Sequence, residues 1–136
     1  MVGKSAFAFM ILAAWSALAA DATLSDRTYG TWRNPKNSVH IEAQSCGDKI
    51  CGVVVWASEK AKADAKRGGT DKLIGQQLFQ DFEERKDGRW KGKVFVPDIN
   101  KTFHGTVTVI DPDTLEGKGC LLGGIGCKSQ VWTRLK

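Results

Sequence analysis

The sequence lacks an apolar run long enough to cross a lipid bilayer. A membrane-spanning helix needs about 20 predominantly apolar residues, and the apolar stretch from Ala6 to Trp15 of this 136-residue chain is much shorter. The chain also lacks a C-x-x-C motif, which argues against disulfide-exchange catalysis. No cysteine lies near residues 17–20, so a lipid-modified cysteine is not indicated. We therefore expect no stable membrane anchor.

Catalytic and cofactor motifs are missing as well. Neither His40 nor His104 lies at a characteristic sequence distance from a serine-nucleophile motif or a pair of carboxylates. Asp111 and Asp113 lack the ligand series and central glycine of a calcium loop. The Gly-Gly-Ile-Gly segment at 123–126 lacks the following lysine of a phosphate-binding loop. The sequence therefore predicts no enzyme activity, no metal and no cofactor.

The charge excess is small, with 20 basic and 15 acidic residues and a net charge of +5. Such an excess favours solubility and weak attraction to anionic surfaces, and it does not indicate nucleic-acid binding. One basic run could contact anionic lipid headgroups or cell-wall polymers, although a solvated face is the simpler interpretation. The run consists of Lys60, Lys62, Lys66, Arg67 and Lys72.

The N-terminus does have the pattern of a secretory signal. Lys4 is the only charged residue before Asp21, an apolar run follows it, and Ala17-Leu18-Ala19 supplies the small residues of a cleavage site. We expect a signal peptide over residues 1–19 and a single domain over residues 20–136, with an uncleaved anchor as the alternative. The expected location is the periplasm or the medium.

The four cysteines fit an oxidising compartment. We favour the pairs Cys46–Cys51 and Cys120–Cys127 because each brackets its own turn. Loops of this size stabilise a fold by about 2–2.5 kcal/mol each in the chain-entropy model. The alternative is a zinc site in which these thiolates act with His40 or His104, but the second pair is spaced too widely for a structural zinc site.

Short segments with β patterning alternate with turns along the rest of the chain. Ser58 to Lys72 interrupts them with a short helix or long loop, for which Ser58 is the expected N-cap and Gly68-Gly69 the end. About eight strands favour a closed antiparallel up-and-down barrel or a sandwich. The expected strands are 28–33, 38–45, 50–57, 76–85, 89–96, 102–110, 115–122 and 129–135.

Two patches resemble the lipocalins and related calycin barrels. Gly30-x-Trp32 is similar to their G-x-W motif, and Trp132-Thr133-Arg134 lies in the last expected strand. The resemblance implies an all-β, eight-stranded calycin-like barrel in which Arg134 packs on Trp32.

A longer pattern is similar to the bacterial domain-of-unknown-function family 2147. Members of that family are small exported proteins without an established activity, so the resemblance implies a compartment and a fold but no substrate. It covers nearly all of residues 20–136. The pattern runs through Gly30-x-Trp32, Cys46-Gly47-x-x-x-Cys51-Gly52-x-x-x-Trp56, Trp90-x-Gly92, Pro97, Lys101-Thr102-Phe103 and Trp132-Thr133-Arg134.

An eight-stranded barrel can be filled by side chains or can hold one small ligand. We expect a non-enzymatic module that binds a small apolar or amphipathic molecule, and an envelope structural or interaction protein with a filled core and a basic face is the alternative. A ligand site would lie at one open end of the barrel. Its expected residues are Trp56, Trp90 and Phe103, with His40 and His104 supplying polar selectivity. The sequence does not indicate the oligomeric state.

Overall fold

The computed structural model describes residue 3, residues 28–120 and residues 126–136. The expected signal peptide apart from residue 3, its cleavage site and the last two residues of the seventh expected strand lie outside the described residues. In the described part, eight antiparallel strands form a closed barrel in chain order, as predicted. The strands are β1 (Gly30–Arg33), β2 (Val39–Cys46), β3 (Lys49–Ala57), β4 (Gln77–Glu84), β5 (Trp90–Val96), β6 (Lys101–Asp111), β7 (Thr114–Cys120) and β8 (Lys128–Arg134).

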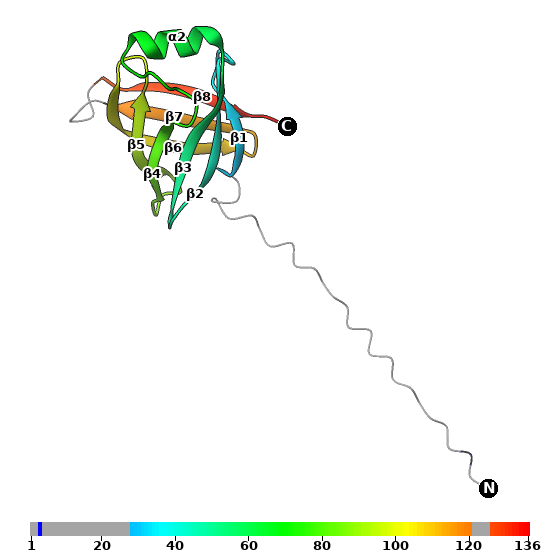
Figure 1. Cartoon of the computed structure of the whole chain (residues 1–136). Helices are drawn as coiled ribbons and strands as arrows, with labels where there is room; N and C mark the ends of the chain where they lie inside the picture. Colours follow the sequence, from blue (N-terminus) through cyan, green and yellow to red (C-terminus); the bar gives the residue numbers. More distant parts are fainter. Residues whose placement is uncertain (1–2, 4–27, 121–125) are drawn as a thin grey trace.

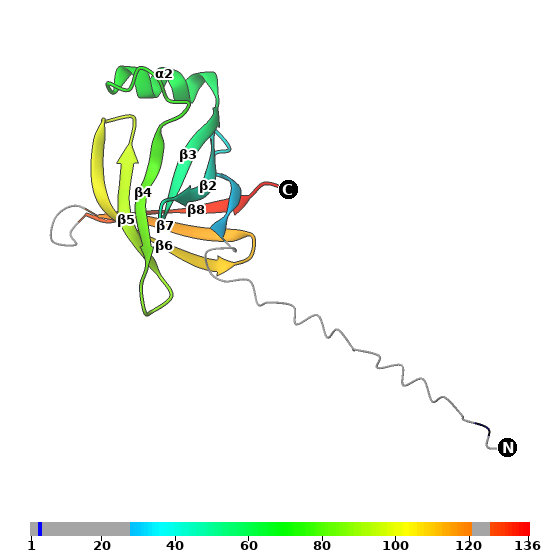
Figure 2. The same cartoon turned by 60° about the horizontal axis from the view of Figure 1, so that its bottom comes forward.

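The segment after β3 is a helix, α2 (Glu59–Arg67). The Ser58 side chain accepts a hydrogen bond from the Ala61 backbone N–H, which satisfies one of the free donors of the first turn. The helix ends at Gly68, as the sequence predicted. Only two alanines, Ala61 and Ala65, contact the hydrophobic core. The helix lies across one end of the barrel (Figures 1 and 2), which we call the α2 end.

The barrel closes where β1 pairs with β8, with Trp32 opposite Arg134. Trp32 is fully buried, and its indole Nε1 donates to the Thr28 carbonyl oxygen over 2.8 Å. The Arg134 guanidinium carbon lies 4.3 Å from the centre of the Trp32 ring. The expected contact between the first and last strands is therefore present.

Both disulfides have the expected local pairing. Cys46–Cys51 joins residues on both sides of the β2–β3 turn, and Cys120–Cys127 joins β7 to the segment before β8. All four cysteines are therefore disulfide-bonded and have no free thiolate to bind zinc, which removes the zinc alternative.

The core is filled towards the end of the barrel away from α2, which carries the β2–β3 and β4–β5 hairpins (Figure 1) and is called the hairpin end. Ile50, Phe82 and Trp90 form one buried cluster there. A second cluster runs from Trp32 through Ile41 to residues that contact the helix. At the α2 end, by contrast, the barrel is only partly filled.

Candidate functional site

A cavity of about 880 Å³, which we call the chamber, occupies the α2 end of the barrel. Its volume lies within the range of small-molecule sites, about 300–1,000 Å³. Its rim is formed by the β1–β2 turn, the first half of α2, the β5–β6 turn and the start of β8. These are the segments that meet at one end of an up-and-down barrel, so the topology itself places the chamber there.

The wall of the chamber is mainly apolar. Leu78 and Phe79 of β4, Val94 of β5, Phe103 of β6 and Trp132 of β8 line it. In the register of the sheet, Phe79 pairs with Val94, and Val94 pairs with Phe103. Paired residues point to the same face of a sheet, so this row of side chains faces the interior together.

One side of the wall is polar. Lys128 and Gln130 of β8 line the chamber, and we call these two residues the polar strip. Their register partners on β7 are Gly119 and Gly117, which have no side chains. The glycines thus leave open space beside an ammonium group and a carboxamide, both of which belong to exposed residues.

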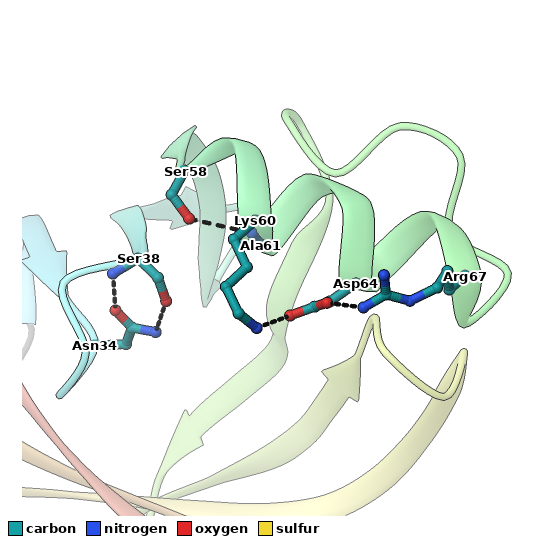
Figure 3. Close-up of polar contacts among 7 residues, drawn as sticks. All are labelled: Asn34, Ser38, Ser58, Lys60, Ala61, Asp64 and Arg67. Carbon is teal, nitrogen blue, oxygen red and sulfur yellow. Dashed lines mark hydrogen bonds and ion pairs between the residues drawn. The ribbon is translucent and has the colours of Figure 1, made fainter.

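The roof of the chamber is α2, from which Lys60 and Asp64 line it. Figure 3 shows the ion pairs that these two residues and Arg67 form. Lys60 Nζ lies 2.9 Å from Asp64 Oδ2, and Arg67 pairs with the other oxygen of the same carboxylate. The hydrogen bond from Lys60 lowers the pKa of Asp64 below its usual value, with further help from the charges of Arg67 and Lys36. Asp64 is therefore ionised at neutral pH, and Lys60 and Arg67 are already partnered.

Hydrogen bonds and a close backbone contact fix the chamber rim on both sides of the helix. Asn34 Oδ1 accepts hydrogen bonds from the backbone N–H groups of Ser38 and Val39, which fixes the β1–β2 turn. Figure 3 shows the contact of Asn34 with Ser38. On the other side, Thr70 Oγ1 donates to the Pro97 carbonyl oxygen over 2.9 Å. Gly68 lies so close to the β5–β6 turn that a Cβ atom there would be 1.9 Å from the Asp98 carbonyl oxygen.

A second cavity, which we call the deep cavity, has a volume of only about 40 Å³ and lies towards the hairpin end. Ile50, Phe82, Trp90 and Val107 are among its apolar lining residues. It is large enough for about one water molecule, but a water needs two or more polar partners. An apolar space of this kind stays dry and is a packing gap rather than a ligand site by itself.

The structure does not bring the five expected ligand residues together. Phe103 lines the chamber, and Trp90 lines the deep cavity. Trp56 is 43% exposed and stacks on His40 with ring centres 4.4 Å apart, and neither residue lines a cavity described above. His104 is exposed and pairs in register with Lys93 and Cys120. The polar strip, which sequence reasoning missed, occupies the place expected for the histidines.

The described residues show no cluster of three or more histidine, cysteine, aspartate or glutamate side chains that could hold a metal ion. Within the same residues, no helix has the length and apolar character needed to span a membrane.

A closed eight-stranded up-and-down barrel with a chamber at one end defines a lipocalin-like protein. Residues 30–134 match the family DUF2147, described as "Uncharacterized protein conserved in bacteria", and the chain belongs to this family. No curated protein matches the sequence.

Among solved structures, the chain is similar to protein HP1028 from the human pathogen Helicobacter pylori, which is described as belonging to the lipocalin family. The two share 18% sequence identity, and the TM-score is 0.62 over 80% of this chain and 83% of that chain. At this identity the similarity shows the fold.

Proposed function

We propose that the protein binds a small amphipathic molecule in the chamber, without catalysing a reaction. The observation that carries this proposal is an open-ended cavity of about 880 Å³ with a mainly apolar wall. Apolar concave sites with a few polar groups are the usual form of small-molecule sites in proteins. Burial of an apolar chain there contributes about 0.8 kcal/mol per methylene group.

The polar strip gives the ligand an orientation. Lys128 and Gln130 lie on the wall at one side, whereas Phe79, Phe103 and Trp132 lie elsewhere on it. Lys128 has no ion-pair partner among the salt bridges of the described residues, unlike Lys60 on the roof. An anionic or hydrogen-bonding headgroup would therefore lie at the polar strip, with the apolar part of the ligand against the aromatic residues.

The alternative of an envelope interaction protein required a filled core and a free basic face. The chamber argues against the filled core. The basic residues of α2 are also partly neutralised, because Lys60 and Arg67 pair with Asp64 and Lys62 pairs with Glu59. Ligand binding is the better explanation for an open barrel.

We also propose that the protein binds its ligand outside the cytoplasm. Two disulfides in one small domain are typical of proteins outside the reducing cytoplasm. Together with the signal pattern at residues 1–19, they support a periplasmic or secreted binding protein. N-terminal sequencing of the protein recovered from its own cells should begin at Ala20 or Asp21, and recovery of Met1 from the envelope fraction would contradict export.

Native mass spectrometry of the protein purified from its own cell envelope is the direct test of binding. We expect a retained ligand, or saturable uptake of one equivalent of an apolar fluorescent dye by the ligand-free protein. Gly119→Leu is a variant that fills the chamber. A Cβ atom at Gly119 meets only Val94, at 4.0 Å, so the new side chain enters the open space without a backbone clash.

Lys118→Leu is the matched control, because Lys118 is the exposed neighbour of Gly119 on β7 and does not line the chamber. We expect Gly119→Leu to weaken dye binding at least tenfold and Lys118→Leu to leave it unchanged. Equal affinity in both variants, or no binding by the unaltered protein, would refute the proposed function.

A further inference from the structure

The chamber and the deep cavity are adjacent, and three residues line both of them. These residues are Phe79 of β4, Gly117 of β7 and Trp132 of β8. Gly117 has no side chain, so the partition between the two spaces consists of the rings of Phe79 and Trp132. The ring centres are 5.5 Å apart, and the rings meet edge to face at an interplanar angle of 80°.

Two glycines on different strands leave room for the Phe79 ring to extend across the barrel interior. A Cβ atom at Gly52 of β3 would lie 2.8 Å from Phe79 Cδ2, and one at Gly117 of β7 would lie 3.3 Å from Phe79 Cε1. The ring of this β4 residue is thus packed against the backbone of its neighbour β3 and also approaches β7, which is not a neighbour of β4 in the barrel. Glycine at both positions allows the ring to extend through the interior.

Towards the hairpin end, the Phe79 ring also contacts Phe82, with ring centres 5.8 Å apart. Phe82 is 2% exposed and lines the deep cavity but not the chamber. The three rings therefore form a series from β8 to the deep cavity. Phe79 is its central member, and it separates open space from packed core.

We propose that Phe79 is the specificity-determining residue of the chamber, because its ring is the floor that limits how far an apolar chain can enter. This inference rests on the proposed function, and ligands with a polar head and an alkyl chain of graded length are the probes that test it. A chain that lies along the chamber from the polar strip ends against Phe79 and Trp132. Longer chains would have to leave their additional methylene groups in water.

The floor has a measurable consequence for binding. Each additional methylene buried in the chamber raises the affinity about fourfold. Once the chain reaches the floor, further methylenes stay in water and add nothing. A plot of affinity against chain length therefore rises and then becomes flat, and the length at which it becomes flat reports the position of Phe79.

The experiment measures the affinities of saturated fatty acids from octanoate to octadecanoate, below their micelle concentrations, by displacement of an apolar dye. In Phe79→Leu the smaller side chain opens the partition, so the affinity should continue to rise about fourfold per methylene for at least one methylene beyond the wild-type plateau. Thermal unfolding establishes that the variant is folded. If it is not, Phe79→Met carries the same test, because its flexible thioether chain can move aside where a ring cannot.

Phe82→Leu is the matched control. It enlarges the deep cavity by the same change of side chain but leaves the Phe79 ring in place, so the plateau should stay at the wild-type length. A plateau that does not move in the folded Phe79 variants overturns the inference while leaving the proposed function intact, as does an equal shift in Phe82→Leu. If the wild-type protein binds the dye but no member of the series, the inference fails and the proposed function stands. If it binds neither, both fail.

Discussion

The Arg134 guanidinium lies 4.3 Å above the centre of the Trp32 ring, and the two residues are register partners at the seam between β8 and β1. The same guanidinium donates from Nη1 to the Tyr29 carbonyl oxygen over 2.6 Å and from Nε to the Pro112 carbonyl oxygen over 2.9 Å. Arg134 therefore connects the segment before β1, the β6–β7 turn and the buried indole. In addition to the pairing of β1 with β8, this one side chain bonds to two backbone carbonyls and stacks on one ring at the seam.

Replacement of Arg134 by alanine should lower the free energy of unfolding by about 2–3 kcal/mol. Loss of the cation–π contact accounts for about 0.5–2 kcal/mol of this, and loss of two hydrogen bonds accounts for the rest. Urea unfolding followed by tryptophan fluorescence measures the change. Arg89→Ala, which removes an exposed ion pair with Asp87, is the control and should cost much less. Equal losses in the two variants would show that the seam contacts contribute nothing beyond surface charge.

Gly30→Ala should destabilise the protein by more than Gly47→Ala does. Both glycines have positive φ values, 121° and 70°, so alanine is strained at either position by about 1–2 kcal/mol. At Gly30 the new Cβ would also lie 2.5 Å from Arg134 Nη1, whereas at Gly47 it would meet nothing within 4 Å. The difference between the two free energies of unfolding combines the clash with Arg134 and the larger backbone strain at a φ of 121°. The part that comes from the clash should disappear when both changes are made in an Arg134→Ala background, and the part that comes from the backbone should remain.

The fold could be predicted almost completely from the sequence, because its signals are local. Turn residues such as Asp87-Gly88 separate segments whose alternation matches the pleat, and the observed strand ends lie within two residues of the predicted ones. The first strand begins at Gly30 rather than at Thr28, because the φ of 121° at Gly30 interrupts the extended chain. Thr28 and Tyr29 instead supply carbonyl oxygens to Trp32 and Arg134.

The candidate site was less predictable, and Trp56 shows why. Ile50, Gly52 and Val54 are buried in alternation on β3, so a regular strand would place Trp56 inside as well. However, Ile41 pairs with Val54 and His40 pairs with Trp56, which leaves Val55 as the extra residue of a β-bulge. The bulge reverses the alternation and turns Trp56 outwards. The local composition gives no signal of a bulge at Val55.

The polar strip was hidden for a related reason. Lys128 and Gln130 alternate in step with the buried Trp132 on β8, so a regular strand turns all three side chains to the same inner face. Lysine and glutamine are ordinarily exposed, however, and only the partial filling of the barrel makes an inward lysine possible. The sequence shows which residues share a face of the strand, but it does not show whether the space inside that face is filled by side chains or left open. That property depends on the glycines of the neighbouring strand, Gly117 and Gly119, which leave the space unfilled.

The pKa of His40 should lie below its ordinary value of 6.5, because partial burial, and to a lesser extent the charge of Arg33, disfavour the imidazolium. In the pH range between the folded-state pKa and 6.5, the unfolded chain then binds more protons than the folded one. The contribution of His40 to stability is therefore fully present above pH 6.5 and is lost as the pH falls through the folded-state pKa. NMR titration of a His104→Gln variant, which leaves one histidine, measures the value directly.

Arg33→Gln should raise the pKa of His40 towards 6.5 by removing the weaker of the two causes. Trp56→Ala should raise it further, because the indole that stacks on the ring at 4.4 Å helps to bury it. A pKa at or above 6.5 in the unaltered protein would contradict the prediction.

Lys128→Gln should weaken the binding of dodecanoate while leaving the binding of dodecanol unchanged. Lys128 lines the chamber and can pair with a carboxylate, whereas an alcohol offers it no charge. The side chain belongs to an exposed residue, so the expected loss is about twofold to fivefold and should shrink as salt is added. Lys118→Gln, on the adjacent strand and outside the chamber, is the control and should change neither affinity. Equal weakening of the acid and the alcohol would show that Lys128 acts through packing, and an unchanged affinity for dodecanoate would place the headgroup away from the polar strip.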